Sequence, residues 1–260
     1  MGVTISPRLA VLNIEVDKVD FGDIERRFCS SRVVLTPNMD HLSNLQLQPQ
    51  FYRIYRSADL VVCDSRVLSL LIRILRRERV APIPGSELFP RLCRARKSDP
   101  GFKVFLLGGT TPEHAALASV NLSASTGVNV VGCYSPPFGF ELMATEFEKI
   151  CDLIRASSAT VVGVGVGSPK QELFIERLLE VFPTGLTFVG IGATIDFESG
   201  LVARAPRVMQ VLCLEWLYRA LREPRRMFLR YFFYDLRVVW LLFNQARGKY
   251  TNPFMDSKIA

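Results

Sequence analysis

Short apolar runs alternate along this chain with longer amphipathic segments. The apolar runs are rich in valine, isoleucine, leucine and phenylalanine and show little polar alternation, which is typical of strands covered on both faces. They predict strands at Leu9–Ile14, Arg32–Leu35, Leu60–Cys63, Lys103–Leu107, Val128–Cys133, Thr160–Val166 and Leu186–Ile191.

The segments between these runs have the length and the periodicity of helices. They predict helices at Phe21–Ser30, Asp40–Ser57, Ser65–Arg77, Ser86–Arg96, Pro112–Ser125, Glu141–Ala156 and Pro169–Phe182. This alternation of strands and helices indicates an α/β fold, with a mostly parallel, Rossmann-like sheet that helices cover on both sides.

The strand pattern stops after Ile191. Two later segments, Pro206–Arg222 and Pro224–Asn244, are predicted as helices with a proline in the first turn, where the missing N–H is tolerated. We therefore expect an α/β core over residues 1–200 and a helical appendage, rich in arginine and aromatic residues, over residues 201–260.

Charge is distributed unevenly in this chain. The 260 residues are 49% apolar, enough for one large domain, and carry a formal net charge of +7. From Ala203 to Tyr250 there are ten basic and three acidic residues, so this segment alone carries the surplus. Basic and aromatic residues together suit a segment that lies on an anionic membrane surface. The alternative is an ordinary helix pair packed on the core or on a second subunit.

Cysteine and histidine usage argues against disulfides and metal sites. The six cysteines form no CxxC pair, and the two histidines show no zinc-ligand spacing, so no metal site is expected. The N-terminus resembles no secretory signal, which favours a reducing cytoplasm. The most apolar late segment, Met227–Phe243, contains Arg230, Asp235 and Arg237, so it is not expected to span a membrane.

Polar residues follow two of the predicted strands, where ligands bind in open parallel sheets. Thr36 and Asn38 come after the run that ends at Leu35. They could donate hydrogen bonds to a ligand, or form a turn and cap the next helix. Asp64 follows the run that ends at Cys63. A carboxylate there could act as a base, or cap the helix that begins beside it.

Further candidates lie at other predicted strand ends and loops. Arg79 could pair with a phosphate or only lie at the surface. Gly109 lies in a glycine turn that matches neither the P-loop nor the dinucleotide motif, which disfavours both enzyme classes. Lys170 and Gln171 follow a glycine-rich strand end and begin a helix, whose N-terminus favours anions. They could instead be exposed residues of a tight turn. Asp196 places a carboxylate after the last strand.

Taken in order, these segments resemble one family of bacterial enzymes. The similar segments are TPNMD (36–40), ADLVVCD (58–64), RVAPIPGSEL (79–88), LLGGT (106–110), VGVGVGSPKQE (162–172), GIGATIDFESGLVARAP (190–206) and LEWLYRALREPRRMFLRY (214–231). The ordered set resembles the WecG/TagA/CpsF glycosyltransferases, the family of the teichoic-acid N-acetylmannosaminyltransferase. The similarity extends from about residue 9 to residue 236.

The resemblance implies an inverting, metal-independent transfer, without a cofactor, from a UDP-sugar to a sugar on undecaprenyl diphosphate. Such a reaction serves the synthesis of cell-surface polysaccharide or exopolysaccharide. N-acetylmannosamine, its uronic acid and glucuronic acid are the candidate donor sugars. The expected location is the cytoplasm, at the inner face of the cell membrane. Nucleic acid is not expected as a partner, and a homo-oligomer is left open.

The resemblance also assigns roles to residues. Asp64 aligns with the proposed catalytic base of the family. The resemblance implies substrate binding by Thr36, Asn38, Arg79 and Gln171. The strand-end pattern adds Gly109, Lys170 and Asp196 to the residues expected to bind substrate. The arginines expected to meet the acceptor diphosphate and the membrane are Arg204, Arg219, Arg225 and Arg226. Ser65 stands where the family usually has glycine, so donor and acceptor specificity do not carry over.

Two other classes of protein are weighed against this interpretation. A nucleotide-dependent oxidoreductase or methyltransferase could use a similar sheet, but no GxGxxG turn follows the first strand. A basic membrane-binding or nucleic-acid-binding protein could use the basic tail. No nucleic-acid-reading module is evident there, because the basic residues alternate with bulky apolar ones.

Overall fold

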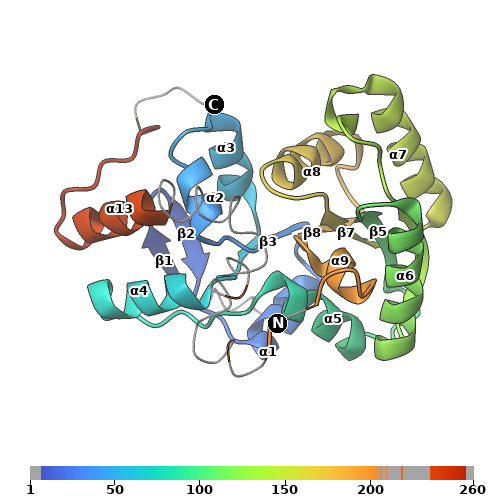
Figure 1. The fold of residues 1–260 in the computed structure, drawn as a ribbon, viewed down its shortest axis with the longest axis horizontal. Helices are drawn as coiled ribbons and strands as arrows, with labels where there is room; N and C mark the ends of the chain where they lie inside the picture. Colours follow the sequence, from blue (N-terminus) through green and yellow to red (C-terminus); the bar gives the residue numbers. More distant parts are fainter. Residues whose placement is uncertain (1–6, 204, 207–208, 210–217, 219–234, 256–260) are drawn as a thin grey trace.

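The computed structural model describes residues 7–203, 205–206, 209, 218 and 235–255. Six parallel strands form the main sheet, in the order β4-β3-β8-β7-β5-β6. They are β3 (Val33–Leu35), β4 (Leu60–Val61), β5 (Lys103–Gly108), β6 (Asn129–Tyr134), β7 (Val161–Gly165) and β8 (Thr187–Gly190). The predicted α/β fold with a parallel sheet is confirmed (Figure 1).

Helices follow the strands in the expected alternation (Figure 1). They are α1 (Phe21–Phe28), α2 (Met39–Asn44), α3 (Pro49–Ser57), α4 (Arg66–Arg76), α5 (Gly85–Ala95), α6 (Pro112–Thr126), α7 (Ala144–Ser157), α8 (Lys170–Val181), α9 (Thr194–Glu198) and α13 (Leu236–Ala246). A 3₁₀ turn at Phe140–Leu142 precedes α7.

Alternate side chains of the central strands enter two separate apolar cores. Along β5, Phe105 and Leu107 pack into the core that includes residues of α3, α7 and α8. Val104 and Leu106 pack into the other core, with residues of α1, α5 and α6. Because both faces are covered, the strands are apolar at successive positions, which is the pattern that predicted them.

The first predicted strand, Leu9–Ile14, is wrong as a strand of the parallel sheet. The chain turns at Leu12, whose φ of 54° is left-handed, and forms an antiparallel hairpin of β1 (Arg8–Val11) and β2 (Ile14–Asp17). In β1, buried Leu9 and Val11 alternate with exposed Arg8 and Ala10, so only one face of this strand is covered. Because the turn residue Leu12 is apolar, the hydrophobic pattern shows no break between β1 and β2.

The predicted helix over Asp40–Ser57 is two helices, α2 and α3. Pro49 begins α3, since a proline cannot donate the backbone hydrogen bond that would continue α2. Leu45 and its neighbours link the two helices, which leaves α2 short and places its N-terminus directly after β3.

After β8, the regular elements of the described residues are helices. The predicted helix Pro224–Asn244 is observed in its second half, where α13 ends at Ala246. Most of the predicted helix Pro206–Arg222 lies outside the described residues. The division at residue 200 therefore stays a prediction. Among the helices that the structure describes, none is long and apolar enough to cross a bilayer.

Candidate active site

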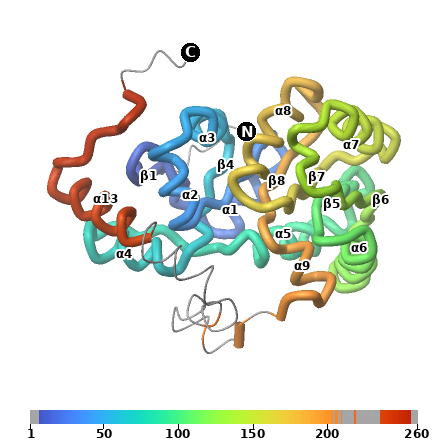
Figure 2. The backbone as a smooth tube through the Cα atoms, turned by 45° about the horizontal axis from the view of Figure 1, so that its top comes forward, coloured from blue at the N-terminus to red at the C-terminus, as the bar shows by residue number. Residues whose placement is uncertain are grey.

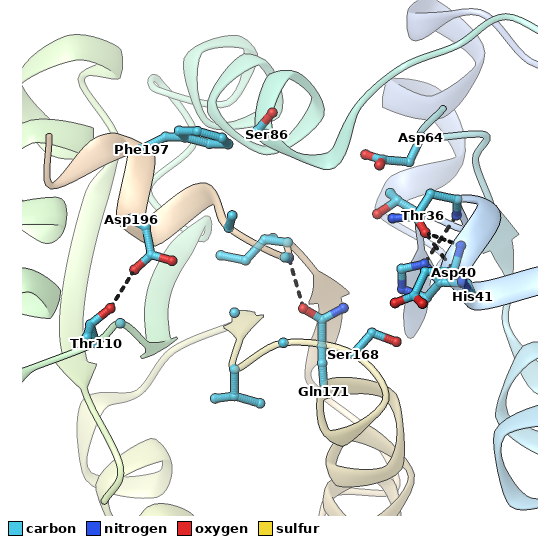
Figure 3. Close-up of a pocket in the computed structure, with 18 residues that line it drawn as sticks. Thr36, Asp40, His41, Asp64, Ser86, Thr110, Ser168, Gln171, Asp196 and Phe197 are labelled. Carbon is cyan, nitrogen blue, oxygen red and sulfur yellow. Dashed lines mark hydrogen bonds between the residues drawn. The ribbon is translucent and has the colours of Figure 1, made fainter. Parts of the chain in front are cut away.

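A cleft of about 450 Å³ opens at the carboxyl ends of the strands (Figure 3). The chain leaves β5 toward β6 on one side and leaves β7 toward β8 on the other. Such a reversal of direction between neighbouring strands is where α/β sheets bind ligands. Among the predicted site residues, those that line this cleft are Thr36, Asn38, Asp64, Gly109, Gln171 and Asp196.

Backbone forms part of the cleft lining. Gly108 has a φ of +136°, and a side chain added there would clash with the carbonyl oxygen of Gly165 in the neighbouring strand. Gly109 and Gly165 both line the cleft. The glycine turn therefore lets a ligand approach the backbone of β5 and β7 closely.

Asp64 extends its carboxylate toward the open centre of the cleft (Figure 3). Its Oδ1 accepts a 2.6 Å hydrogen bond from the backbone N–H of Gly85, the first residue of α5. Helix capping, the alternative role for Asp64, belongs to Ser65, whose hydroxyl accepts from the N–H of Leu68 at 3.2 Å. The N–H at a helix start therefore fixes the position of the carboxylate, which faces the cleft, where a general base can reach an acceptor hydroxyl.

Thr36 and Asn38 lie on the wall formed by the loop after β3. Thr36 is buried and its hydroxyl donates to the carbonyl of Gly190, at 3.3 Å. Asn38 caps α2: its Oδ1 accepts from the N–H groups of Asp40 and His41, at 3.0 and 3.3 Å. The capping role is thus present in the structure, and Asn38 also lines the cleft.

A buried polar network that the sequence analysis missed crosses the cleft lining. Nδ1 of His41 accepts from the backbone N–H of Asn38 at 3.2 Å. In the neutral ring the proton is then on Nε2, which lies 3.2 Å from Oε1 of Glu172 and donates to it. The same Oε1 accepts from Nε2 of Gln171 at 2.8 Å. The network connects the start of α2 to the start of α8.

Gln171 extends the network to the loop after β8. Its side chain is buried, and its Oε1 accepts from the backbone N–H of Gly192 at 2.8 Å. Gln171 was predicted to contact substrate, and it does line the cleft, but its amide joins Glu172 to Gly192. This geometry holds together the loops that follow β3, β7 and β8.

The electrostatics of His41 reflect this burial. Burial by itself lowers the pKa of His41, but Glu172, through its charge and its hydrogen bond, opposes the effect. The nearby carboxylates of Asp64 and Asp40 also raise the pKa. The net result is that the pKa of His41 is raised above its ordinary value. Histidine at position 41 follows the capping Asn38 by three residues, and that spacing was the only signal in the sequence.

Asp196 lies across the cleft from Asp64, beside Thr110 (Figure 3). The Thr110 hydroxyl donates to Oδ1 of Asp196 at 3.3 Å. Burial raises the pKa of Asp196, and the hydrogen bond from Thr110 reduces that effect without cancelling it. The two carboxylates therefore line opposite ends of one cleft.

The structure does not bring the remaining predicted residues into the lining of this cleft. Lys170 forms an ion pair with Glu141 at 2.5 Å, and its ammonium lies 4.9 Å from the ring centre of Phe138. Arg79 is exposed in the segment between α4 and α5. Their predicted substrate contacts stay predictions. Outside the described residues lie the predicted acceptor-binding arginines Arg204, Arg219, Arg225 and Arg226.

Metal-ligand geometry is not found in the part of the chain that the structure describes. Within it, no three or more histidine, cysteine, aspartate or glutamate side chains come together as a metal site would need.

One comparison with known proteins bears on this site. The family model described as the glycosyl transferase WecG/TagA/CpsF family matches residues 9–252. The match covers both the cleft and α13, and it confirms the resemblance found in the sequence.

Proposed function

Because the chain belongs to the WecG/TagA/CpsF family of glycosyltransferases, which act in cell-surface polysaccharide synthesis, we propose a specific reaction for it. The donor is a UDP-sugar, and the acceptor is a sugar already attached to undecaprenyl diphosphate. The enzyme inverts the configuration of the anomeric carbon. N-acetylmannosamine, its uronic acid and glucuronic acid are the donor sugars to test first.

The placement of Asp64 is the observation that carries this proposal. Its carboxylate faces the cleft, and the N–H of Gly85 holds one of its oxygens. In the proposed step, Asp64 takes the proton of an acceptor hydroxyl while that oxygen bonds to the anomeric carbon. The bond between the anomeric carbon and the donor phosphate oxygen breaks, and UDP leaves from the opposite face. General-base assistance of this kind contributes about 10²–10⁴-fold.

The departing diphosphate needs positive partners. The start of α8, beside Ser168 and Gly167 of the lining, presents the positive end of a helix dipole to it. Asp196 and Thr110, at the other end of the cleft, supply a pair of groups for donor hydroxyls. We propose that the end of the cleft with Asp196 and Thr110 takes the nucleotide and that the end with Asp64 takes the acceptor.

The proposal includes turnover without a divalent metal and association with the inner face of the membrane. Turnover is measured as UDP release in the presence of a chelator, with a panel of UDP-sugars and a short-chain lipid diphosphate acceptor. Undiminished release after chelation supports metal independence, and recovery only on adding a divalent cation contradicts it.

Asp64→Asn tests the base. The substitution keeps the size of the side chain and its acceptor oxygen for Gly85, but it removes the basic carboxylate. We expect turnover to fall by about 10²–10⁴-fold while UDP still binds in calorimetry. Asp152→Asn, at an exposed position on α7, is the matched control. Full activity of Asp64→Asn would remove Asp64 from this role.

A further inference from the structure

Two neighbouring helices expose apolar side chains at one end of the molecule. On α4, Leu70 is 45% exposed and Ile74 is 64% exposed. On α13, the exposed apolar side chains are Leu236, Trp240 and Phe243. The two helices contact each other, and Figures 1 and 2 show them side by side at the edge away from α6 and α7.

The exposed apolar residues do not belong to the helix faces that pack on the core. On α4, buried Leu68 and Ile72 face the protein, while Leu70 and Ile74 lie four residues apart on another side. On α13, the residues that face the core are Val238 and Leu242, and the exposed ones again follow a helical spacing. Each helix therefore has one apolar face that is covered and a second that is exposed.

Arginines supply all the charged side chains of these two helices. The exposed arginines of the two helices and their ends are Arg73, Arg77, Arg237 and Arg247. Residues 66–77 and 236–247 contain no aspartate or glutamate. Apolar side chains interspersed with arginines match a surface that offers hydrocarbon under negative head groups.

The start of α4 lies close to the proposed base in the cleft. Helix α4 begins at Arg66, two residues after Asp64, and Ser65 between them caps it. A bilayer on the exposed side of α4 would lie beside the proposed acceptor side of the cleft. The head group of a lipid-linked acceptor could then reach Asp64 while its chain stays in the bilayer.

We propose that the exposed sides of α4 and α13 form one surface, the α4–α13 face, which binds an anionic lipid bilayer. This inference rests on the proposed function, because it supplies the membrane contact that a lipid-linked acceptor needs. It also assigns half of that contact to a helix of the α/β core. The sequence had placed the membrane contact in the appendage alone.

Vesicle co-sedimentation of the full chain tests the α4–α13 face. The vesicles are phosphatidylcholine with phosphatidylglycerol, or phosphatidylcholine alone. The variant Leu70→Glu with Ile74→Glu should lower the binding constant for the mixed vesicles about tenfold or more. The control is Leu117→Glu with Val120→Glu on α6, because these two side chains are likewise 45% and 64% exposed. The control should bind the vesicles like the unmodified chain.

Arg73→Gln with Arg77→Gln tests the charge separately. Binding to the mixed vesicles should fall and depend less on salt concentration, while the weak binding to phosphatidylcholine alone stays the same. Circular dichroism and thermal unfolding establish that each variant is folded. The proposal is overturned if folded Leu70→Glu/Ile74→Glu binds mixed vesicles as well as the control does. It is also overturned if that variant only converts an oligomer to a monomer, since the face would then join copies of this chain.

Turnover separates this inference from the proposed function. With a short-chain acceptor in solution, the α4 variant should keep the kcat of the unmodified chain, and with the acceptor in vesicles its activity should fall. Equal loss with both acceptors would contradict the membrane role of the face. Absence of turnover by the unmodified chain with every UDP-sugar would instead contradict the proposed function, and would leave the vesicle result standing.

Discussion

The backbone N–H of Gly85 lies 2.6 Å from Oδ1 of Asp64 and donates a hydrogen bond to it. This contact joins the first residue of α5 to a residue in the loop that follows β4. A second bond, from the N–H of Asp64 to the carbonyl of Pro37 at 3.0 Å, fixes the backbone on the other side. The proposed base is therefore held by main-chain atoms of two neighbouring segments.

Gly85→Ala should disturb the base without a strained backbone. A Cβ atom at this position would lie 2.9 Å from Oγ1 of Thr36 and 3.7 Å from Oδ1 of Asp64, so either the start of α5 or the Thr36 side chain must shift. We expect kcat to fall by about 10²-fold, because small misplacements of a reacting group have costs of that order. Gly22→Ala on α1 is the control, since its Cβ would meet only the ends of flexible side chains. Equal kcat values for the two variants would contradict this role of Gly85.

Ser65 should prove to be a structural cap. Ser65→Ala removes the acceptor for the N–H of Leu68 and should lower the free energy of unfolding by about 1 kcal/mol. Ser65→Gly should cost only a few tenths of that. Urea unfolding measures both. If the glycine variant also turns over a bulkier acceptor, Ser65 narrows the acceptor side of the cleft.

Two substitutions at His41 separate its two hydrogen bonds. Asparagine can keep an acceptor near the position of Nδ1 for the N–H of Asn38, whereas glutamine can keep a donor near Nε2 for Glu172. The asparagine variant leaves the buried carboxylate of Glu172 with one donor fewer. We expect it to be the less stable of the two, by about 1–3 kcal/mol, in urea unfolding. A glutamine variant that is less stable than the asparagine variant would show that the contact with Asn38 matters more.

The raised pKa of His41 predicts a pH dependence of stability. A histidine with a raised folded-state pKa stabilises the protein fully below its unfolded value of 6.5. That stabilisation is lost as the pH rises through the folded-state pKa. The stability of the unmodified chain relative to His41→Gln should therefore decrease as the pH rises across this window. Parallel pH profiles for the two proteins would contradict the prediction.

Asp196→Asn should raise stability and weaken donor binding. Burial raises the pKa of Asp196 above 3.8, so its charged form is disfavoured in the folded protein at neutral pH. The asparagine variant avoids this cost and should unfold at a higher urea concentration at neutral pH, with the difference vanishing below the unfolded-state pKa. It should also bind the donor more weakly, with an increased KM. If the KM for the donor is unchanged in this variant, Asp196 does not contribute to donor binding.

Several elements were predictable because their signals are local. The strand over Lys103–Leu107 and the helix over Pro112–Ser125 agree with β5 and α6 within one residue at each end. Glycine, proline and capping residues mark these ends in the sequence itself. The hairpin of β1 and β2 was missed for the opposite reason. Leu12 adopts a turn conformation that is unusual for leucine, and only the pairing of the strands reveals it.

Residue types and motif order in the sequence determined the α/β class, the family and the presence of a carboxylate after β4. They did so because buried strands, helix starts and family segments are encoded in neighbouring residues. Only the tertiary structure decided which side chain does what: Ser65 caps α4, Asp64 faces the cleft, and Gln171 joins Glu172 to Gly192. These roles depend on contacts between segments far apart in the chain, and the spacing of neighbouring residues does not encode such contacts.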